Sequence, residues 1–237
     1  MSIGAVLDEA WTLFTRFFLR FFAIALVVFA VINLFYALVV SAISNDENGA
    51  AVALAIVGFA TAVVGSTWLQ GAFVYAVQDA RDGVFDASLG EVFSRVSSSI
   101  VPLLVAGLLA GLGIAFGLLL LIVPGLFLLT IWAVIAPVIV VEKRSALESF
   151  GRSRELVRGH GWTVFGIVLI TGLLSGIASS LLQAAFSFLP RFLEILVGST
   201  IAQAVVAPFG AIALAITYFR LREAHGGAAA AEPVAEA

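Results

Sequence analysis

Long apolar runs separated by short polar segments dominate this sequence. Six runs approach or exceed the roughly 20 apolar residues that a helix needs to cross the hydrocarbon core of a bilayer. None has a charged residue in its middle, and the fourth is short, so its ends should use the flanking turn and interface. The pattern predicts an all-α polytopic membrane bundle with six transmembrane helices at about 21–43, 51–76, 100–122, 125–141, 163–187 and 197–219.

The segment that precedes each odd-numbered span is amphipathic. Apolar residues recur with the 3.6-residue period of a helix over 3–21, 88–100 and 145–158. Such helices can lie in the membrane interface with the apolar face toward the lipid and basic side chains near the headgroups. In the third segment, the residues predicted on the apolar face are Ala146, Leu147, Phe150 and Val157.

An internal echo links two of these segments. The pattern S-x-x-E-x-F-x-R begins at Ser88 and again at Ser145, 57 residues later. Serine followed by glutamate three residues on is a capping box, which starts a helix. The first segment keeps a fragment, Glu9-Ala-Trp11. Four matched positions of common residue types can arise by chance, but their equivalent places before a span favour three repeats, each an amphipathic helix followed by a hairpin.

Composition explains why lipid must cover much of the surface. The chain has 237 residues, of which 62% are hydrophobic and 11% charged, against about 45–50% and about 25% in soluble domains. The absence of cysteine excludes disulfides and thiolate metal sites. No basic stripe with interleaved aromatic residues is present, so nucleic acid is not an expected partner.

The basic residues lie almost entirely on one side of the six-span arrangement. Only Arg191 falls on the other side, and cytoplasmic loops are enriched in Lys and Arg. The sequence therefore predicts a multi-pass protein of the cell membrane with both termini in the cytoplasm, and a disordered cytoplasmic tail over 226–237. The eleven residues on the predicted inner side are Arg16, Arg20, Arg81, Arg95, Lys143, Arg144, Arg152, Arg154, Arg158, Arg220 and Arg222.

Pairs of glycines four residues apart recur in the spans, as at Gly113 and Gly117 and at Gly172 and Gly176. This spacing lets helix backbones approach closely. Six spans offer many internal partners, so packing inside one bundle is favoured over formation of a homodimer.

Catalytic signatures are missing from the sequence. The two histidines, His160 and His225, have no carboxylate or second histidine at metal-ligand spacing. There is no G-x-S-x-G elbow, P-loop or H-E-x-x-H. We therefore predict no enzymatic activity and no cofactor; an intramembrane enzyme would need a cluster of titratable groups, for which Glu142, Glu148 and His160 are the candidates.

Two groups of residues are candidate binding sites. A basic cluster could hold anionic lipid headgroups, although topology alone accounts for the same charges. Three glutamines could converge on a polar site within the membrane, although hydrogen bonds between helices are the simpler interpretation. The cluster is Lys143, Arg144, Arg152, Arg154 and Arg158, and the glutamines are Gln70, Gln183 and Gln203.

Residues 100–170 resemble the membrane domain of glycerophosphoryl diester phosphodiesterases and related six-span prokaryotic membrane proteins. The residues that carry the resemblance are Pro124-Gly125, Pro137, Glu142, Ala146-Leu147, Arg152-Ser153, Leu156-Val157, Gly159 and Trp162. These motifs are specific for the family but not for a function.

The resemblance implies the membrane part without the catalytic part. In the fused members a separate TIM barrel carries the phosphodiesterase chemistry, and a barrel takes about 250 residues, which no part of this chain could hold. No catalytic residue carries over. The sequence thus favours a scaffold or accessory protein that engages lipid, including anionic lipid, or another membrane protein. The alternative is a small transporter or channel for a neutral or amphiphilic solute.

Overall fold

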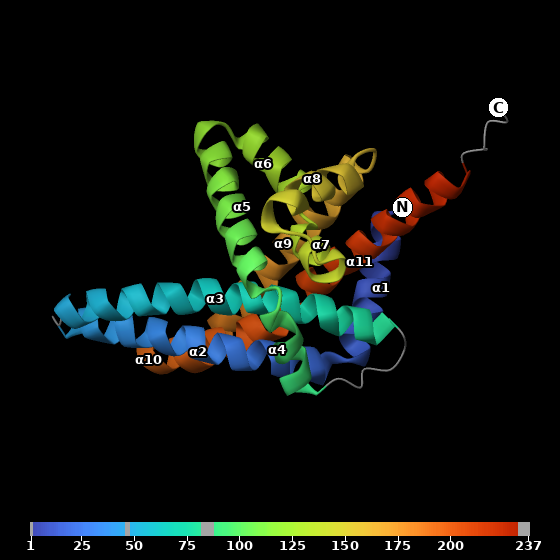
Figure 1. Cartoon of the computed structure of the whole chain (residues 1–237). Helices are drawn as coiled ribbons and strands as arrows, with labels where there is room; N and C mark the ends of the chain where they lie inside the picture. Colours follow the sequence, from blue (N-terminus) through green and yellow to red (C-terminus); the bar gives the residue numbers. More distant parts are fainter. Residues whose placement is uncertain (1, 46–47, 82–87, 232–237) are drawn as a thin grey trace, which may run out of the picture.

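The computed structural model describes residues 2–45, 48–81 and 88–231, and the regular structure of that part of the chain is helical (Figure 1). One π-helical segment, η1, interrupts the α-helices. In chain order the elements are α1 (Ile3–Arg16), α2 (Phe18–Ser44), α3 (Asn48–Arg81), α4 (Leu89–Ser97), α5 (Ile100–Leu120), α6 (Ile122–Ile131), α7 (Ile135–Glu142), α8 (Ala146–Val157), α9 (Gly161–Ala185), α10 (Arg191–Leu193), η1 (Glu194–Ser199) and α11 (Thr200–Ala231).

Three helical hairpins provide the spans: α2 with α3, α5 with α6 and α7, and α9 with α11. Six stretches of the described chain are long and apolar enough to cross a membrane. They confirm the predicted all-α, multi-pass membrane architecture. Their bounds are Phe18–Ser44, Gly49–Arg81, Ile100–Leu120, Ile122–Glu142, Gly161–Ala185 and Arg191–His225.

Both predicted capping boxes start a helix. At α4, the Ser88 backbone N–H donates to the Glu91 carboxylate at 2.7 Å, and the Glu91 N–H donates to the Ser88 hydroxyl at 3.3 Å. At α8, the backbone N–H and the hydroxyl of Ser145 both donate to the Glu148 carboxylate, at 3.0 and 2.7 Å. These bonds satisfy groups that have no partner within the helix, so the echoed motif has the same structural task in both places.

A second correspondence between the repeats is visible only in three dimensions. An aromatic side chain two residues after the motif glutamate packs edge-on against an aromatic ring of a neighbouring hairpin, a favourable geometry for two rings. Each partner side chain belongs to the hairpin of the preceding repeat, and for α1 of the first repeat that hairpin is the one in the third repeat. The pairs are Phe93 with Trp68 (5.3 Å between centroids), Phe150 with Trp132 (4.9 Å) and Trp11 with Phe209 (6.2 Å).

The buried core lies toward the end of the molecule that carries α1, α4 and α8, which we call the basic side. Among its largest fully buried side chains are those of Phe21, Phe73, Leu156, Ile167, Ile216 and Tyr218. Nearer the hairpin tips, apolar side chains are exposed: Ile56 by 67%, Leu119 by 83% and Phe188 by 80%. In a membrane protein such surfaces can face lipid, because lipid tails are as apolar as these side chains.

The α5–α6 hairpin diverges from the α2–α3 hairpin in Figure 1, and the two meet near the basic side. A Cβ atom at Gly71 of α3 would lie 3.0 Å from the Leu103 side chain of α5, whereas one at Gly111, farther along α5, would meet nothing within 4 Å. The two hairpins are thus in close contact near the basic side and separate toward their tips.

The predicted apolar face of α8 is wrong at one position. Leu147 is 73% exposed, whereas Ser149 and Ser153 are fully buried. The serines tolerate burial because their hydroxyls are satisfied: Ser149 donates to the Ser145 carbonyl at 2.7 Å, and Ser153 donates to the Ile131 carbonyl at 2.8 Å. The latter carbonyl ends α6 and has no partner within its own helix.

The fourth span differs from its prediction in two ways. The residues between the third and fourth predicted spans, 123 and 124, lie inside the first turn of α6, and the chain reverses at the extended residue Leu121. The span is also broken over 132–134, between α6 and α7. Proline clashes with the carbonyl four residues earlier and has no N–H to donate to it. For Pro137 that residue is Ala133, in the middle of the break.

The C-terminal span continues farther than predicted. The π-helical turn η1 leads into α11, which runs to Ala231 and so includes residues 226–231 of the predicted tail. Alanine has the highest helix propensity, and four alanines follow Gly227. The rest of the predicted tail, 232–237, lies outside the described residues.

Candidate functional site

A network of polar side chains at the basic side gathers residues from three elements. At its centre is Glu142, the last residue of α7. Its carboxylate accepts hydrogen bonds from Arg152 of α8 at 3.1 and 3.2 Å, from Arg144 at 2.9 Å and from the buried Tyr218 hydroxyl of α11 at 3.1 Å. Arg152 also bonds to Glu155 at 2.9 Å. We call these five residues the Glu142 hub.

The chain reversal between α7 and α8 makes the hub possible. Lys143 adopts the left-handed conformation, with φ of 54°, directly after the last residue of α7. A residue in this conformation commonly ends a helix, although the position is usually occupied by glycine. Ser145 then caps α8. The tight turn brings Glu142 and Arg152 together although they are ten residues apart in sequence.

Electrostatics in the hub favour the charged forms of Arg152 and Glu155. Burial alone lowers the pKa of Arg152, but the hydrogen bonds to Glu155 and Glu142 outweigh it, so the net pKa is raised. The hydrogen bond from Arg152 lowers the pKa of Glu155. The side chains of Glu142 and Arg152 are 14% and 20% exposed, and a partly buried ion pair is better insulated from water than a surface pair. Arg152 and Glu155 are therefore held in their charged forms within the hub.

Lys143 also contacts other residues of the chain. Its amine donates to the Tyr75 hydroxyl of α3 and to the buried Ser99 hydroxyl beside α5, the latter at 3.4 Å. It thereby ties the α7–α8 turn to the first two hairpins. Three members of the predicted basic cluster, Lys143, Arg144 and Arg152, are thus engaged with other residues of the chain.

The other two members of the basic cluster point outward. Arg154 of α8 and Arg158, the residue that directly follows α8, are both exposed and lie four positions apart. Leu147 and Gly151 complete the same exposed face, at i, i+4, i+7 and i+11. We call these four residues the α8 stripe. It presents an apolar side chain near the start of the helix and two positive charges near its end.

A separate set of ion pairs joins α1, α3 and α11. Arg220 donates to the Glu9 carboxylate at 2.6 and 2.9 Å and to the Ala5 carbonyl at 3.2 Å. Arg81 lies 3.6 Å from Glu9 and 3.1 Å from Glu223. The arginines predicted to mark topology thus also hold the basic side together.

The two capping glutamates predict a pH dependence of their helices. The Ser88 backbone N–H and side chain lower the pKa of Glu91, and the Ser145 hydroxyl and backbone N–H lower the pKa of Glu148. A group whose pKa is lowered in the folded state stabilises the fold at pH values above its unfolded-state pKa. That stabilisation is lost as the pH falls through the folded-state pKa. We expect the first-turn amides of α4 and α8 to lose protection from hydrogen exchange when the pH is lowered below about 4.

Serine-to-alanine variants test the cause of this dependence. Ser88→Ala and Ser145→Ala remove the side-chain part of each capping interaction, so the carboxyl carbons of Glu91 and Glu148 should titrate at higher pH in NMR spectra. Unchanged titration midpoints would contradict the assignment of the lowered pKa values to the capping contacts.

The structure places the three glutamines in different surroundings. Gln70 on α3 is exposed, whereas Gln183 on α9 and Gln203 on α11 are half-buried. Gln70 lies toward the basic-side end of its helix. Gln183 and Gln203 lie near the opposite ends of theirs, on either side of the α9–α11 connection. The fold therefore separates Gln70 from the other two along the length of the hairpins.

The titratable residues considered for an enzyme lie in different surroundings. Glu142 belongs to the hub, and the exposed Glu148 belongs to its capping box. His160 lies at the start of α9 with its Nδ1 buried without a hydrogen-bond partner, and its ring centroid is 6.3 Å from that of His225. No group of three or more potential metal ligands occurs among the described residues. Glu142, Glu148 and His160 thus have different neighbours.

Sequence reasoning missed the hub as a unit. Glu142 stood out as a carboxylate at a span edge beside five basic residues, a signal that it would pair with one of them. Nothing in the sequence linked it to Tyr218, 76 positions away. Comparison of the chain with protein-family models, with curated proteins and with solved structures finds no match.

Proposed function

We propose that this multi-pass membrane protein is a scaffold or accessory protein whose basic side engages anionic lipid headgroups. The observation that carries the proposal is the α8 stripe. Arg154 and Arg158 are exposed, whereas the neighbouring basic side chains of Lys143, Arg144 and Arg152 contact groups of the chain itself. The charges of Arg154 and Arg158 are therefore the ones most available to a headgroup.

The surroundings of the stripe fit a membrane interface. Leu147 is 73% exposed on the same face of α8, and Trp162, at the start of α9, is 86% exposed. Tryptophan is enriched at the membrane–water interface because its ring is amphipathic. An exposed leucine and tryptophan beside two arginines match a surface that inserts apolar groups shallowly and holds headgroups with its charges.

The proposed orientation places the basic side in the cytoplasm. It follows from the one-sided distribution of Lys and Arg and would bring the stripe to the leaflet in which anionic lipids attract basic segments. Since the chain has no cysteine, a cysteine introduced at position 2 or 45 can be labelled alone. A membrane-impermeant reagent added outside cells should label position 45 and spare position 2.

Neutralising the stripe tests the proposed lipid contact. We expect Arg154→Gln with Arg158→Gln to lower the preference for phosphatidylglycerol over phosphatidylcholine about thirtyfold, since each of the two basic residues near an anionic leaflet contributes about 1 kcal/mol. The measurement is lipid selectivity of the protein in mixed bilayers, by electron paramagnetic resonance of spin-labelled lipids.

Arg191→Gln is the control for a changed charge. This residue is 63% exposed, pairs with Glu194 three residues on, and lies at the opposite ends of the spans. The control should keep the selectivity of the native chain. Equal selectivity of the native chain and the double variant, with both correctly inserted, would reject the lipid contact and leave a protein partner as the scaffold's target.

A further inference from the structure

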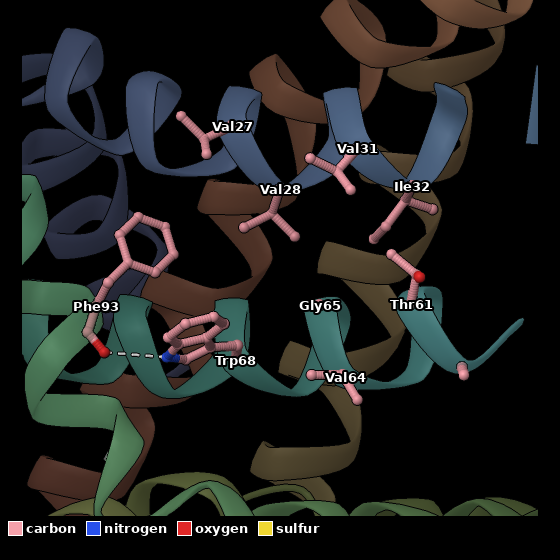
Figure 2. A pocket seen from close by; sticks show the side chains of 10 residues that line it. Val27, Val28, Val31, Ile32, Thr61, Val64, Gly65, Trp68 and Phe93 are labelled. Carbon is pink, nitrogen blue, oxygen red and sulfur yellow. Dashed lines mark hydrogen bonds between the residues drawn. The ribbon is translucent and has the colours of Figure 1, made fainter. Parts of the chain in front are cut away.

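An apolar groove lies between α2 and α3 and ends at α4 (Figure 2). It encloses about 560 Å³. Val27, Val28, Val31 and Ile32 form one wall, and Thr61, Val64, Gly65 and Trp68 form the other. Phe93 of α4 closes one end, and its ring packs edge-on against Trp68.

The polar groups of the groove are already satisfied. The Trp68 ring N–H donates to the Phe93 carbonyl at 3.1 Å, and the Thr61 hydroxyl donates to the Val57 carbonyl at 2.8 Å. Both bonds belong to the protein's own structure, so the lining offers little to a polar ligand. A ligand with unmet hydrogen bonds would lose free energy on entering such a site. The lining therefore selects hydrocarbon.

The position of the groove restricts the form of that hydrocarbon. Both walls belong to membrane spans. On α3 the lining runs from Ala60 to Trp68, which is about 12 Å at 1.5 Å per residue, or about two fifths of the hydrocarbon thickness. The groove thus occupies part of one leaflet, on the side of α4. A transmembrane helix from a partner would need to continue past Phe93, whereas a flexible chain can enter from the side.

From these observations we infer that the groove holds one acyl chain of a phospholipid from the basic-side leaflet. The rim supports lateral entry from the bilayer, because Val27, Val31 and Val64 are 52%, 46% and 41% exposed. Gly65 sets the depth: a Cβ atom there would lie 3.2 Å from the side chains of Val28 and Ile32. The site recognises a chain and is independent of the headgroup contact proposed for the α8 stripe.

Tryptophan fluorescence tests this inference directly, because Trp68 lines the groove. A variant that keeps Trp68 as its only tryptophan, with Trp11, Trp132 and Trp162 changed to phenylalanine, is reconstituted in phosphatidylcholine bilayers. Phosphatidylcholine with a brominated acyl chain is then titrated in as a quencher. We expect quenching to report chain binding at least about fourfold tighter than random lipid contact, the ratio that one further buried CH₂ gives.

A filled groove supplies the decisive comparison. Val64→Phe, added to the single-tryptophan chain, places a ring at the rim and should abolish the preferential quenching. Val57→Phe is the matched control, since Val57 is 49% exposed on the same helix and lies outside the groove; it should leave quenching unchanged. Val31→Phe fills the groove from the α2 wall and decides the result if Val64→Phe does not fold.

The outcomes distinguish an acyl-chain site from random lipid contact and from an interface between two copies of the chain. Quenching that matches random lipid contact, or that survives both groove-filling variants, would overturn the inference. A change from dimer to monomer on filling the groove would instead assign it to a second copy of the chain and would also overturn it. Arg154→Gln with Arg158→Gln should not affect quenching of Trp68, so failure of the headgroup proposal is visible separately.

Discussion

Changing Glu142 to alanine should lower the free energy of unfolding by about 3 kcal/mol, the cost of leaving one member of a buried ion pair without its partner. Glu142 accepts hydrogen bonds from Arg152, Arg144 and Tyr218. The variant would leave the fully buried Tyr218 hydroxyl without this acceptor, and a buried polar group that loses its partner carries a full desolvation penalty. Unfolding in mixed micelles with increasing SDS would measure the loss.

Glu155→Ala provides the control for this variant. Glu155 bonds to the same arginine, but its side chain is 62% exposed, and exposed ion pairs contribute at most about 1 kcal/mol. The two variants should therefore differ by about 2 kcal/mol or more. Equal destabilisation by both would show that the Glu142 hub has no special weight in holding α7, α8 and α11 together.

A tyrosine-to-phenylalanine change tests the reach of the hub into α11. Tyr218→Phe removes only the hydroxyl. If the Tyr218–Glu142 hydrogen bond is an integral part of the network, its effect should shrink when Glu142 is already alanine, because residues in one network are not additive. Additive effects of the two changes would place Tyr218 outside the network.

Changing Gly125 to alanine should destabilise the second hairpin by about 2 kcal/mol, within the range for overpacked sites. A Cβ atom there would lie 2.4 Å from the Leu118 side chain and 2.6 Å from the Leu118 backbone nitrogen. A side chain can rotate away, but the α5 backbone can move only if the hairpin opens. The same SDS titration measures the change, and cysteines introduced near the two ends of the hairpin report its opening.

Gly172→Ala is the matched control on α9. An added Cβ atom there would meet nothing within 4 Å. In a helix interior alanine is favoured over glycine by up to about 1 kcal/mol, so this variant should be as stable as the native chain or slightly more stable. A Gly125→Ala protein that matched Gly172→Ala in stability would contradict the close approach of α5 and α6.

The architecture was predictable because each of its signals is local. Apolar length specifies a membrane helix when no water is available to the backbone, and all six spans were found this way. The capping boxes at Ser88 and Ser145 were predictable because Ser and Glu three residues apart reach the same helix end. The break before Pro137 follows from a local rule as well, because proline has no N–H to donate within a helix.

The role of each basic residue was not predictable, because a count of charges does not show which residues each side chain contacts. The five basic residues at 143–158 look equivalent in sequence, yet Arg152 bonds to Glu142 and Glu155 whereas Arg154 and Arg158 are exposed. The difference follows from which face of α8 packs on its neighbours. The same packing leaves Leu147 exposed, although the helical period alone had assigned this residue to the apolar face.

Local sequence is enough to specify the helices, their membrane character and the repeated helix starts, since these depend on residues within a few positions of one another. Only the packing of the three hairpins around the basic side brings Glu142 to Tyr218, closes the groove with Phe93 beside Trp68, and sets Gln70 apart from Gln183 and Gln203. Packing joins residues far apart in the chain, and no local pattern records it.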